Sequence, residues 1–399
     1  MTERLYFEDA YRKEFEARVL ERFVHEARPA VVLDRTGFYP ESGGQPSDRG
    51  TLGGAKVLHV FEEGHRIVHL LDRELAGQEA VCGVIDWARR FDHMQQHSGQ
   101  HILSQSFIEL LQGETQSFHL GEQSSTLEIG LSSISEAELE RVELRANEVV
   151  FEDREIRTYF VEAAEIATVP LRRPPKKEGT IRVVEVSGFD FSACGGTHCR
   201  RTGEIGLIKI IRWDKIRNNL RFEFLCGGRA REDYREKNRS VLEISRKFSV
   251  HEREAARAVE KAMEEARQLR KRLRRIQEAL AVFEARELAE KEAGWLVRRV
   301  FTDKTAEEAK LLALNIIRLA ERAVLFAVRG ADRDHFIFAR SEKIPLDMRE
   351  LVSWVAERAK GKGGGSPSLV EVVAEKGGDL EAILSAAAEY LSLKFGPLG

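Results

Sequence analysis

The feature that most constrains this chain is a long segment without glycine or proline, from Arg229 to Ala293. These two residues most often end or kink a helix, so their absence favours a continuous helix. Within the segment, apolar residues follow one another at alternating steps of four and three, which is a heptad seam. The seam consists of Ala255, Val259, Ala262, Ala266, Leu269, Leu273, Ile276, Leu280 and Phe283. We therefore predict one long helix over 229–293, which either pairs with itself or a partner or packs along its own domain.

The predicted helix separates parts with different patterns. Residues 1–86 alternate short apolar runs with glycine turns, which predicts a small β-rich subdomain. Residues 87–228 mix helical segments with strands and predict an α/β domain. Residues 294–399 begin with apolar strands, continue with a helix and contain a glycine loop at GKGGGS, which predicts a small α/β domain. The expected fold class is α+β, with these four parts.

The composition excludes several classes of protein. Of the 399 residues 42% are hydrophobic, which supports buried cores and excludes global disorder. The 63 basic and 66 acidic residues give a net charge of −3, which excludes a globally basic nucleic-acid binder but not a local basic face. Residues 200–221 hold seven basic and two acidic residues, and RQLRKRLRR at 267–275 holds six basic ones, so both segments are candidates for phosphate contacts.

The expected compartment is the cytoplasm. No uncharged apolar run is long enough to span a membrane, and the charged start of the chain does not have the pattern of a signal peptide. Four cysteines are too few for a disulfide scaffold, which favours a reducing environment.

Two pairs of residues have the spacing of metal ligands. His97 and His101 are four residues apart in a helical segment, so both imidazoles lie on one face. Cys194 and His198 have the same separation in CGGTH, where the glycines allow a tight turn. Three nitrogens and one thiolate suit Zn²⁺. Cys199 adjoins the cluster and is a rival ligand.

Several well-defined catalytic motifs are absent. The sequence contains no HExxH zinc motif, no PCxxC deaminase signature, no serine nucleophile elbow and no GxxxxGK[ST] phosphate loop. The metal constellation therefore does not match these enzyme classes by motif alone.

Three segments resemble a known family. RTGFYPESGGQPSDRG, DHMQQHSGQH and GFDFSACGGTHCRRTGEIG are similar, in order and separation, to the editing domain of alanyl-tRNA synthetases and its freestanding AlaX form. The C-terminal part resembles the tail of these synthetases, where a long helix leads to a DHH-associated domain with a GKGGG-type motif. The family's motif usually continues with Arg-Pro, whereas Ser366 and Pro367 follow here. The resemblance covers nearly the whole chain and is to the long form of AlaX.

The resemblance implies an editor that acts in trans and needs no ATP. Its reaction would be hydrolysis of the ester in mischarged tRNA for alanine, chiefly seryl- and also glycyl-tRNA. It implies Zn²⁺ held by His97, His101, Cys194 and His198. Three ligands with an open position would suit activation of a water, whereas four would favour an anchoring role, and the sequence does not choose between them.

The resemblance also points to Thr36 and Gln45 as catalytic and specificity residues, because they match positions that face the amino acid. Alanine lacks the hydroxyl of serine, so a polar site that alanine would leave unpaired can reject it. The residues alone favour structural roles instead, with Thr36 as a strand residue that makes a local hydrogen bond and Gln45 as a solvated loop residue. His93 and His119 lie in matching segments and are candidates to support the centre.

Two other functions remain open at this stage. The chain could edit another aminoacyl-tRNA of the threonyl type, since that related domain has the same ligand pattern. It could also be a zinc-stabilised RNA-binding protein without catalysis. The expected partners are tRNA for alanine and, through the seam, a second copy in a homodimer, with no membrane and no ATP.

Overall fold

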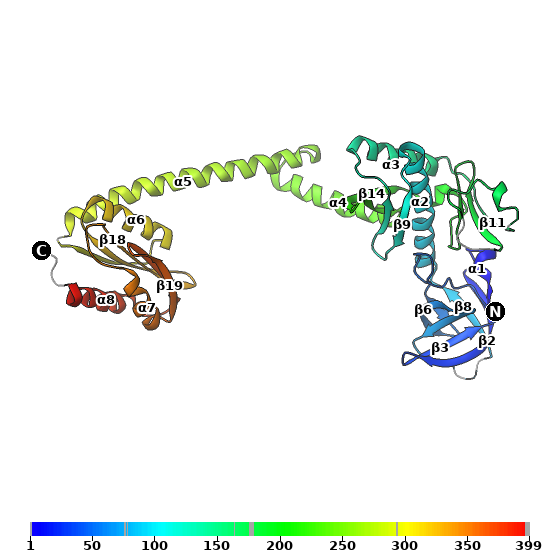
Figure 1. Ribbon diagram of the computed structural model, residues 1–399, viewed down its shortest axis with the longest axis horizontal. Helices are drawn as coiled ribbons and strands as arrows, with labels where there is room; N and C mark the ends of the chain where they lie inside the picture. Colours follow the sequence, from blue (N-terminus) through cyan, green and yellow to red (C-terminus); the bar gives the residue numbers. More distant parts are fainter. Residues whose placement is uncertain are drawn as a thin grey trace. The chain divides into compact units, whose positions relative to one another are not determined.

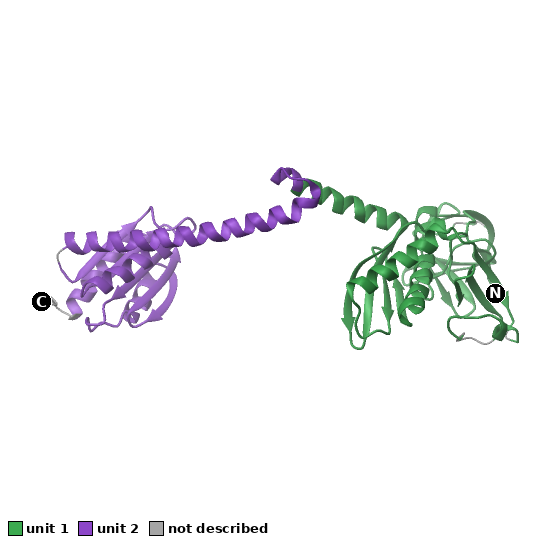
Figure 2. Ribbon diagram, turned by 90° about the horizontal axis from the view of Figure 1, so that it is seen from above, with its two compact units in different colours: residues 1–244 green, residues 245–399 purple. Residues whose placement is uncertain are grey.

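The computed structural model describes residues 2–75, 77, 79–162, 164–174, 179–292 and 294–395. The chain divides into two compact units, residues 1–244 and residues 245–399 (Figure 2). Each unit combines helices with its own β-sheets and hydrophobic cores, so the predicted α+β class is confirmed. The division into four parts is finer than this and remains a prediction.

The first unit begins with a closed barrel of six strands in the order β2-β3-β7-β6-β5-β8 (Figure 1). These strands are β2 (Glu14–His25), β3 (Arg28–Leu33), β5 (Gly50–Leu52), β6 (Ala55–Glu63), β7 (Arg66–Leu71) and β8 (Ala80–Ile85). Buried and exposed residues alternate along β8, as expected for a strand with one face in a core. Phe15, Leu33 and Leu71 are part of the core that the barrel encloses. Beside the barrel lie β1 (Glu3–Arg4), α1 (Leu5–Glu8) and β4 (Arg35–Thr36).

Helix α2 (Trp87–Leu111) is the central helix of the remaining part of this unit. Its first turn is capped by Asp86, whose carboxylate accepts a hydrogen bond from the backbone N–H of Arg89. Met94 and Phe107 on α2 share a hydrophobic core with Phe222. Because this core surrounds one side of α2, it fixes which face of the helix is available for a site.

Two sheets complete the first unit, with strand orders β14-β15-β10-β9 and β11-β12-β13. The elements are β9 (Thr115–Leu120), β10 (Ser125–Ile129), α3 (Glu136–Phe151), β11 (Ile156–Val161), β12 (Ile181–Val186), β13 (Asp190–Ala193), β14 (Ile208–Ile216), β15 (Asn219–Cys226) and α4 (Gly227–Phe248). Short 3-10 turns lie at Ile166–Thr168 and Thr202–Ile205.

The predicted long helix exists as α5 (Ala255–Lys291), but its predicted extent over 229–293 is wrong. Helix α4 ends at Phe248, and Ser249 has a φ of 54°, a left-handed conformation that ends helices. A 3-10 turn at Glu252–Glu254 follows before α5 begins. The residue that ends the helix is a serine and not a glycine or proline, so the absence of glycine and proline did not exclude a break. Among the described residues, no helix has the length and apolar character needed to cross a membrane.

The second unit contains a five-stranded sheet in the order β16-β17-β18-β20-β19. Within this sheet β16 and β17 pair in parallel, and the other neighbouring strands pair in antiparallel register. The elements after α5 are β16 (Leu296–Phe301), α6 (Ala306–Leu319), β17 (Ala323–Arg329), β18 (Arg333–Arg340), α7 (Arg349–Arg358), β19 (Gly361–Ser366), β20 (Leu369–Glu375) and α8 (Leu380–Phe395). One core includes Phe336 and Leu351, and a second joins Leu312 of α6 to Ala285 near the C-terminal end of α5.

The predicted glycine loop at GKGGGS is wrong, because Gly361–Ser366 forms the edge strand β19. It pairs with β20 in antiparallel register through its backbone, which needs no side chains. A Cβ at Gly363 would lie 2.3 Å from the carbonyl oxygen of Glu371, so this close approach requires glycine. Glycine has a low propensity for β-strands, so the sequence did not indicate a strand here.

His69 on β7 is fully buried in the barrel. Its Nδ1 lies 3.3 Å from the carbonyl oxygen of Val31, and its Nε2 lies 2.8 Å from Oγ1 of Thr36. Burial lowers the pKa of His69 from 6.5 to about 4. The unfolded chain therefore binds a proton at this residue at a higher pH than the folded chain does.

This difference predicts a pH-dependent stability of the protein. The contribution of neutral His69 is complete above pH 6.5 and is lost as the pH falls towards 4, by about 3 kcal/mol of unfolding free energy. Substitution His69→Gln should remove this part of the pH dependence, whereas His65→Gln, at an exposed position, should keep it. Urea unfolding between pH 4 and pH 7 measures the effect. Equal slopes for wild type and His69→Gln would contradict the prediction.

Candidate metal centre

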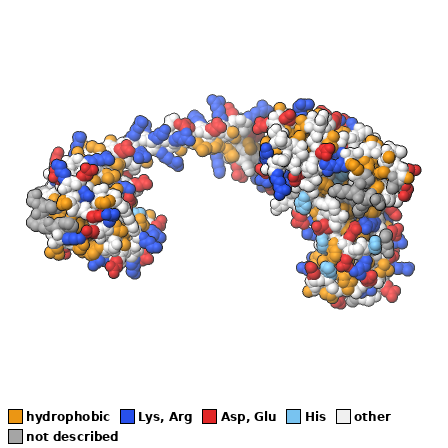
Figure 3. Space-filling model, viewed as in Figure 1, with side chains coloured by type: hydrophobic (Ala, Val, Ile, Leu, Met, Phe, Trp, Pro, Cys, Tyr) orange, Lys and Arg blue, Asp and Glu red, His pale blue; other side chains and the backbone are white. Residues whose placement is uncertain are grey.

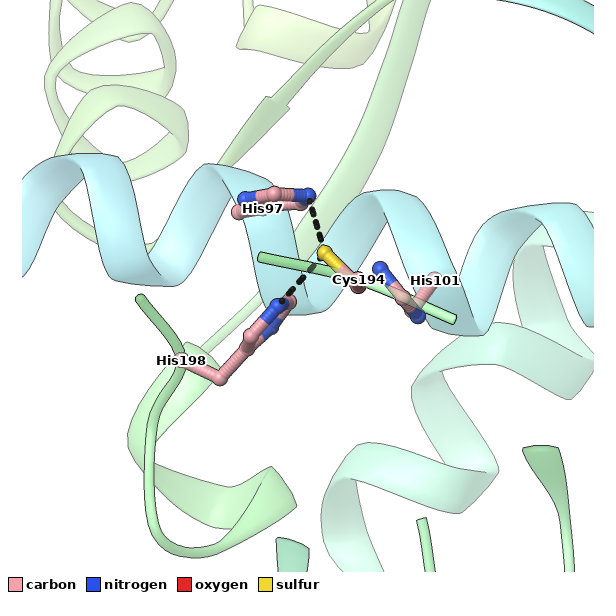
Figure 4. Close-up of side chains that lie close together, drawn as sticks. All are labelled: His97, His101, Cys194 and His198. Atoms are coloured by element: carbon pink, nitrogen blue, oxygen red, sulfur yellow. Dashed lines mark hydrogen bonds between the residues drawn. The ribbon is translucent and has the colours of Figure 1, made fainter. Parts of the chain in front are cut away.

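Two segments of the first unit bring four potential ligands together (Figure 4). His97 and His101 lie one turn apart on α2, so both rings leave the same helix face. Cys194 directly follows β13, and His198 lies in the loop after it. One ligand atom from each of the four lies within 4.8 Å of all the others. The two pairs identified by spacing therefore meet at one point.

The spacing of the ligand atoms fits a tetrahedral zinc ion. The Sγ of Cys194 lies 3.4 Å from Nε2 of His97 and 3.4 Å from Nε2 of His198. A Zn–S bond of about 2.3 Å and Zn–N bonds of about 2.0–2.1 Å place sulfur and nitrogen about 3.6 Å apart in a tetrahedron. The donor set of three imidazoles and a thiolate is also one that zinc prefers. The residues present therefore fit Zn²⁺.

A second layer of oxygen atoms orients the three imidazoles. Each ring has an oxygen near its Nδ1: Gln45 Oε1 at 2.7 Å from His97, Asp190 Oδ2 at 3.1 Å from His101, and Ser98 Oγ at 3.3 Å from His198. These contacts leave the Nε2 atoms directed towards the centre. Such outer partners select the tautomer of a ligand histidine and hold its ring in place.

Asp190 is the charged member of this second layer. Its side chain is fully buried, lies 3.3 Å from the guanidinium of Arg172 and accepts a hydrogen bond from Ser192. Burial opposes its ionisation, but the hydrogen bond with His101 and the charge of Arg172 outweigh burial and lower the pKa of Asp190. Asp190 is thus ionised and, despite burial, raises the pKa of His101 through their hydrogen bond.

The electrostatics at the centre favour the ligand forms of Cys194 and His198, whereas Asp190 favours the protonated form of His101. Burial opposes ionisation of the Cys194 thiol, but the neighbouring His97 and His198 outweigh it, and its pKa lies well below the usual value. Burial and then the charge of His97 lower the pKa of His198 to about 3. A thiolate beside a neutral imidazole is the state that binds a metal ion without first losing protons.

Gly196 allows the ligand loop to approach α2. A Cβ at this position would lie 2.2 Å from Cε1 of His97 and 2.8 Å from Oε1 of Gln45. No side chain fits there, so the CGGTH loop can close over the helix only with glycine at this point.

The structure brings Gln45 to the centre. Its Oε1 accepts hydrogen bonds from Nδ1 of His97 and from the backbone N–H of Thr197, at 2.7 and 3.2 Å. Its Nε2 donates to Oγ1 of Thr197 at 2.8 Å. Gln45 is fully buried, which excludes the alternative of a solvated loop residue.

Thr36 lies in a different environment, at the wall of the barrel. Its Oγ1 accepts a hydrogen bond from the backbone N–H of Phe38 at 3.1 Å and pairs with Nε2 of His69. When Nδ1 of His69 donates to Val31, the hydroxyl of Thr36 must donate to Nε2. Both local hydrogen bonds match the structural alternative, and they leave one lone pair of the hydroxyl for a further donor.

The remaining candidates fall outside the ligand cluster. Cys199 is buried in the hydrophobic core and does not belong to the group of four ligand atoms, so it is not the rival ligand. Burial raises its pKa to about 12. His93 is buried on α2 with Nδ1 unpartnered among the described residues. His119 is exposed on β9, beside the loop that holds Gly43, Gly44 and Gln45, which is called the glycine loop from here on.

Reading the sequence missed three residues that support the centre: Asp190, Thr197 and Ser98. Asp190 and Thr197 flank the ligands in the second segment, and Ser98 follows His97 directly. Polar residues beside the ligands were a signal, but which of them turn inwards depends on the path of the backbone.

Comparison with family models places this site in a recognised type of domain. The model described as the threonyl and alanyl tRNA synthetase second additional domain matches residues 181–222, which include Cys194 and His198. The model for class II (A) tRNA synthetases matches residues 9–89. The segment that carries Cys194 and His198 is thus similar to a domain described for threonyl and alanyl tRNA synthetases.

Relatives of known name match over much longer stretches. The alanyl-tRNA editing protein AlaX-L of Pyrococcus horikoshii is 30% identical over 382 residues, which is 92% of this chain and 94% of that protein. This chain belongs to the AlaX-L family of alanyl-tRNA editing proteins. The alanine–tRNA ligase of Archaeoglobus fulgidus is 30% identical over 98% of this chain, and the chain spans 44% of that ligase. Among solved structures, the C-Ala domain of Aquifex aeolicus alanyl-tRNA synthetase covers 26% of this chain at 24% identity, with a TM-score of only 0.24.

The second layer predicts a measurable effect on metal affinity. Substitution Asp190→Asn removes the charge that orients His101 and should weaken zinc binding about 10- to 100-fold. The control Asp214→Asn changes a carboxylate whose side chain is 69% exposed, and it should leave affinity unchanged. Competition with a chromophoric chelator measures both. Equal affinities for Asp190→Asn and wild type would show that Asp190 does not support the centre.

Proposed function

We propose that this protein is a trans-editing hydrolase that removes the wrong amino acid, chiefly serine and also glycine, from tRNA for alanine. The observation that carries the proposal is the buried three-histidine, one-cysteine centre with Gln45 bonded to it. Family membership over 92% of the chain supports the choice of tRNA. The reaction needs no ATP, because an aminoacyl ester is already activated. We assign the protein to the cytoplasm, where the thiol of Cys194 stays reduced.

Bound Zn²⁺ would supply a Lewis acid that polarises the ester or lowers the pKa of a water molecule. Four protein ligands leave no open tetrahedral position, which favours a role of the centre in anchoring and orientation. Gln45 has a second amide N–H beyond the one that Thr197 accepts, and we assign this donor to an oxygen of the ester.

Thr36 provides the specificity in this proposal. Its proton is committed to His69 and one lone pair to Phe38, so it can only accept from a substrate. The hydroxyl of a seryl group can donate to this lone pair, whereas the methyl group of alanine cannot.

The closed ligand set also favours one rival function. A zinc ion with four protein ligands is typical of structural sites, as a zinc-stabilised RNA-binding protein without catalysis would have. The threonyl-type editor is a rival of the same class, since the matching family model covers both synthetases. Activity on defined substrates separates all three.

Deacylation of purified aminoacyl-tRNA tests the proposal. Zinc-loaded protein should hydrolyse seryl-tRNA for alanine at least about tenfold faster than the alanyl form. His101→Ala should abolish activity together with zinc binding, and Gln45→Ala should lower kcat about 100-fold. The controls His65→Ala and Gln116→Ala change exposed residues and should be active.

The rivals predict different outcomes in the same assay. Hydrolysis of seryl-tRNA for threonine alone would identify the threonyl-type editor. Folded, zinc-bound protein without activity on any substrate would favour the binding protein, and in that case removal of zinc should unfold the chain.

We propose that the basic helix α5 supplies tRNA contacts. The basic side chains of 267–275 are exposed along the helix (Figure 3). The second basic segment, 200–221, offers less positive charge to a phosphate than its composition suggests, because carboxylates from other segments pair with its residues. These pairs are Arg200–Asp9, Arg201–Asp153, Lys209–Glu143, Arg212–Glu223 and Arg221–Glu128. Phosphate contacts from α5 would give salt-dependent affinity without sequence readout.

We also propose that a second copy of the chain covers the seam on α5. Five seam residues are 50–67% exposed: Leu269, Leu273, Ile276, Leu280 and Phe283. Water-exposed apolar residues at heptad spacing are the pattern of a helix that pairs with another helix.

The seam predicts a homodimer in solution. Substitution Leu273→Glu places a charge in the seam and should convert the dimer into a monomer. The control Gln268→Glu adds the same charge at an exposed residue off the seam and should stay dimeric. Sedimentation velocity at micromolar concentration measures the mass. A monomeric wild-type protein would contradict the prediction.

A further inference from the structure

A pocket of about 460 Å³ lies between the glycine loop and the end of β9, and we call it the glycine-loop pocket. Its wall includes Gly43 and Gly44 on the loop side and Gly121 on the strand side. Gln45 also lines it, and the Oε1 of Gln45 is 2.7 Å from Nδ1 of His97. The pocket therefore begins one side chain away from the metal centre, and its volume is in the range of small-ligand sites.

Two arginines in the wall share a single carboxylate. The Nη2 of Arg49 and the Nη1 of Arg89 donate to the same oxygen, Oε1 of Glu122, at 3.1 and 3.3 Å. Glu122 is 61% exposed, and exposed ion pairs of this kind contribute only about 0–1 kcal/mol. Glu122 is therefore a weak partner that an incoming anion can displace.

Arg89 is the better fixed of the two arginines. Its side chain is only 16% exposed, and its Nε donates to the carbonyl oxygen of Ser47 at 3.1 Å. This bond holds the guanidinium at the glycine loop, while its Nη1 contacts Glu122 in the pocket wall. An arginine held in this way is suited to bidentate binding of a phosphate.

A third arginine lies behind the wall, where a carboxylate pairs with it. Arg229 donates to the carbonyl oxygen of Gly121 at 2.7 Å and pairs with Asp92. Burial and then the charges of Arg89 and Arg229 lower the pKa of the buried His93 to about 3. Glu41 also lines the pocket, and its carboxylate lies 3.7 Å from Nε2 of His59, so we place the anion beside the two arginines.

We propose that the glycine-loop pocket is a nucleotide subsite, in which Arg89 and Arg49 bind the 5′-phosphate of the nucleotide that carries the ester. The inference rests on the proposed function and adds the position of the substrate's last nucleotide. In an aminoacyl-tRNA, one ribose ring separates this phosphate from the ester oxygen. Binding the phosphate at the arginines orients the ribose, so that its ester points past Gln45 to the metal centre.

Equilibrium binding to the zinc-loaded full chain tests the subsite, with adenosine 5′-monophosphate and adenosine as probes. The monophosphate should bind wild type at least about tenfold more tightly than adenosine. Arg49→Ala and Arg89→Ala should each reduce this preference, and Glu122→Gln should increase it, because the competing carboxylate is gone. The control Arg66→Ala removes a barrel arginine that pairs with Glu21 and should have no effect.

The set of variants distinguishes a loss of phosphate binding from a disturbed loop structure. Arg89 also holds Ser47, so a loss in Arg89→Ala alone could reflect a disturbed loop, whereas Arg49 bonds Glu122 and can be removed separately. A gain in Glu122→Gln does not follow from loss of structure. Equal binding of the two probes by wild type, no binding of either, or a preference that persists in both arginine variants would overturn the proposal.

Deacylation assays then separate this inference from the proposed function. If seryl-tRNA for alanine is hydrolysed, Arg49→Ala should raise KM at least severalfold and leave kcat nearly unchanged, as expected for a residue that binds the substrate away from the ester. An unchanged KM would contradict the subsite. A different result is that wild type hydrolyses no ester but prefers the monophosphate over adenosine, and that the arginine variants lose this preference. In that case the proposed function fails and the nucleotide subsite remains.

Discussion

The buried ion pair between Arg90 and Asp48 is the interaction on which the site depends. Both side chains are fully buried, and the Nε of Arg90 lies 3.0 Å from each carboxylate oxygen. The same guanidinium donates to the carbonyl oxygens of Ala10 and Gly37. Loss of one partner of such a pair costs about 3–5 kcal/mol, because it leaves a buried charge without compensation. The pair joins the first turn of α2 to the end of the glycine loop, and so sets Gln45 against His97.

In the metal centre, too, residues from different segments hold one another in place. Its ligands come from two segments, and the orienting oxygens come from three: the glycine loop, α2 and β13. Because buried polar groups require partners, each ring is held on its outer side before a metal binds. Arg172 continues the network, since it compensates Asp190 and donates to the carbonyl oxygen of His101. The site is thereby oriented by the protein and needs little rearrangement to bind an ion.

Local sequence patterns predicted the long helix well, but they did not predict where helices end or where glycines form a strand. The heptad seam identified α5, because side-chain spacing within one helix is a property of consecutive residues. The break at Ser249 was missed, since its left-handed conformation depends on how the chain turns between two helices. The strand Gly361–Ser366 was missed because glycine has a low propensity for strands. Its pairing with β20, which stabilises it as a strand, is a contact that only the folded chain makes.

By itself, the sequence determined which residues could bind a metal, because the residue types and the four-residue spacing of His97 and His101 are local. It also determined the α+β class through the alternation of strand and helix patterns. Only the tertiary structure decided that Cys194 meets these histidines, that Gln45 bonds to His97, and that Thr36 instead bonds to His69. The physical reason is that these contacts join residues far apart in the chain, and packing of α2, the barrel and the ligand loop around buried cores brings them together.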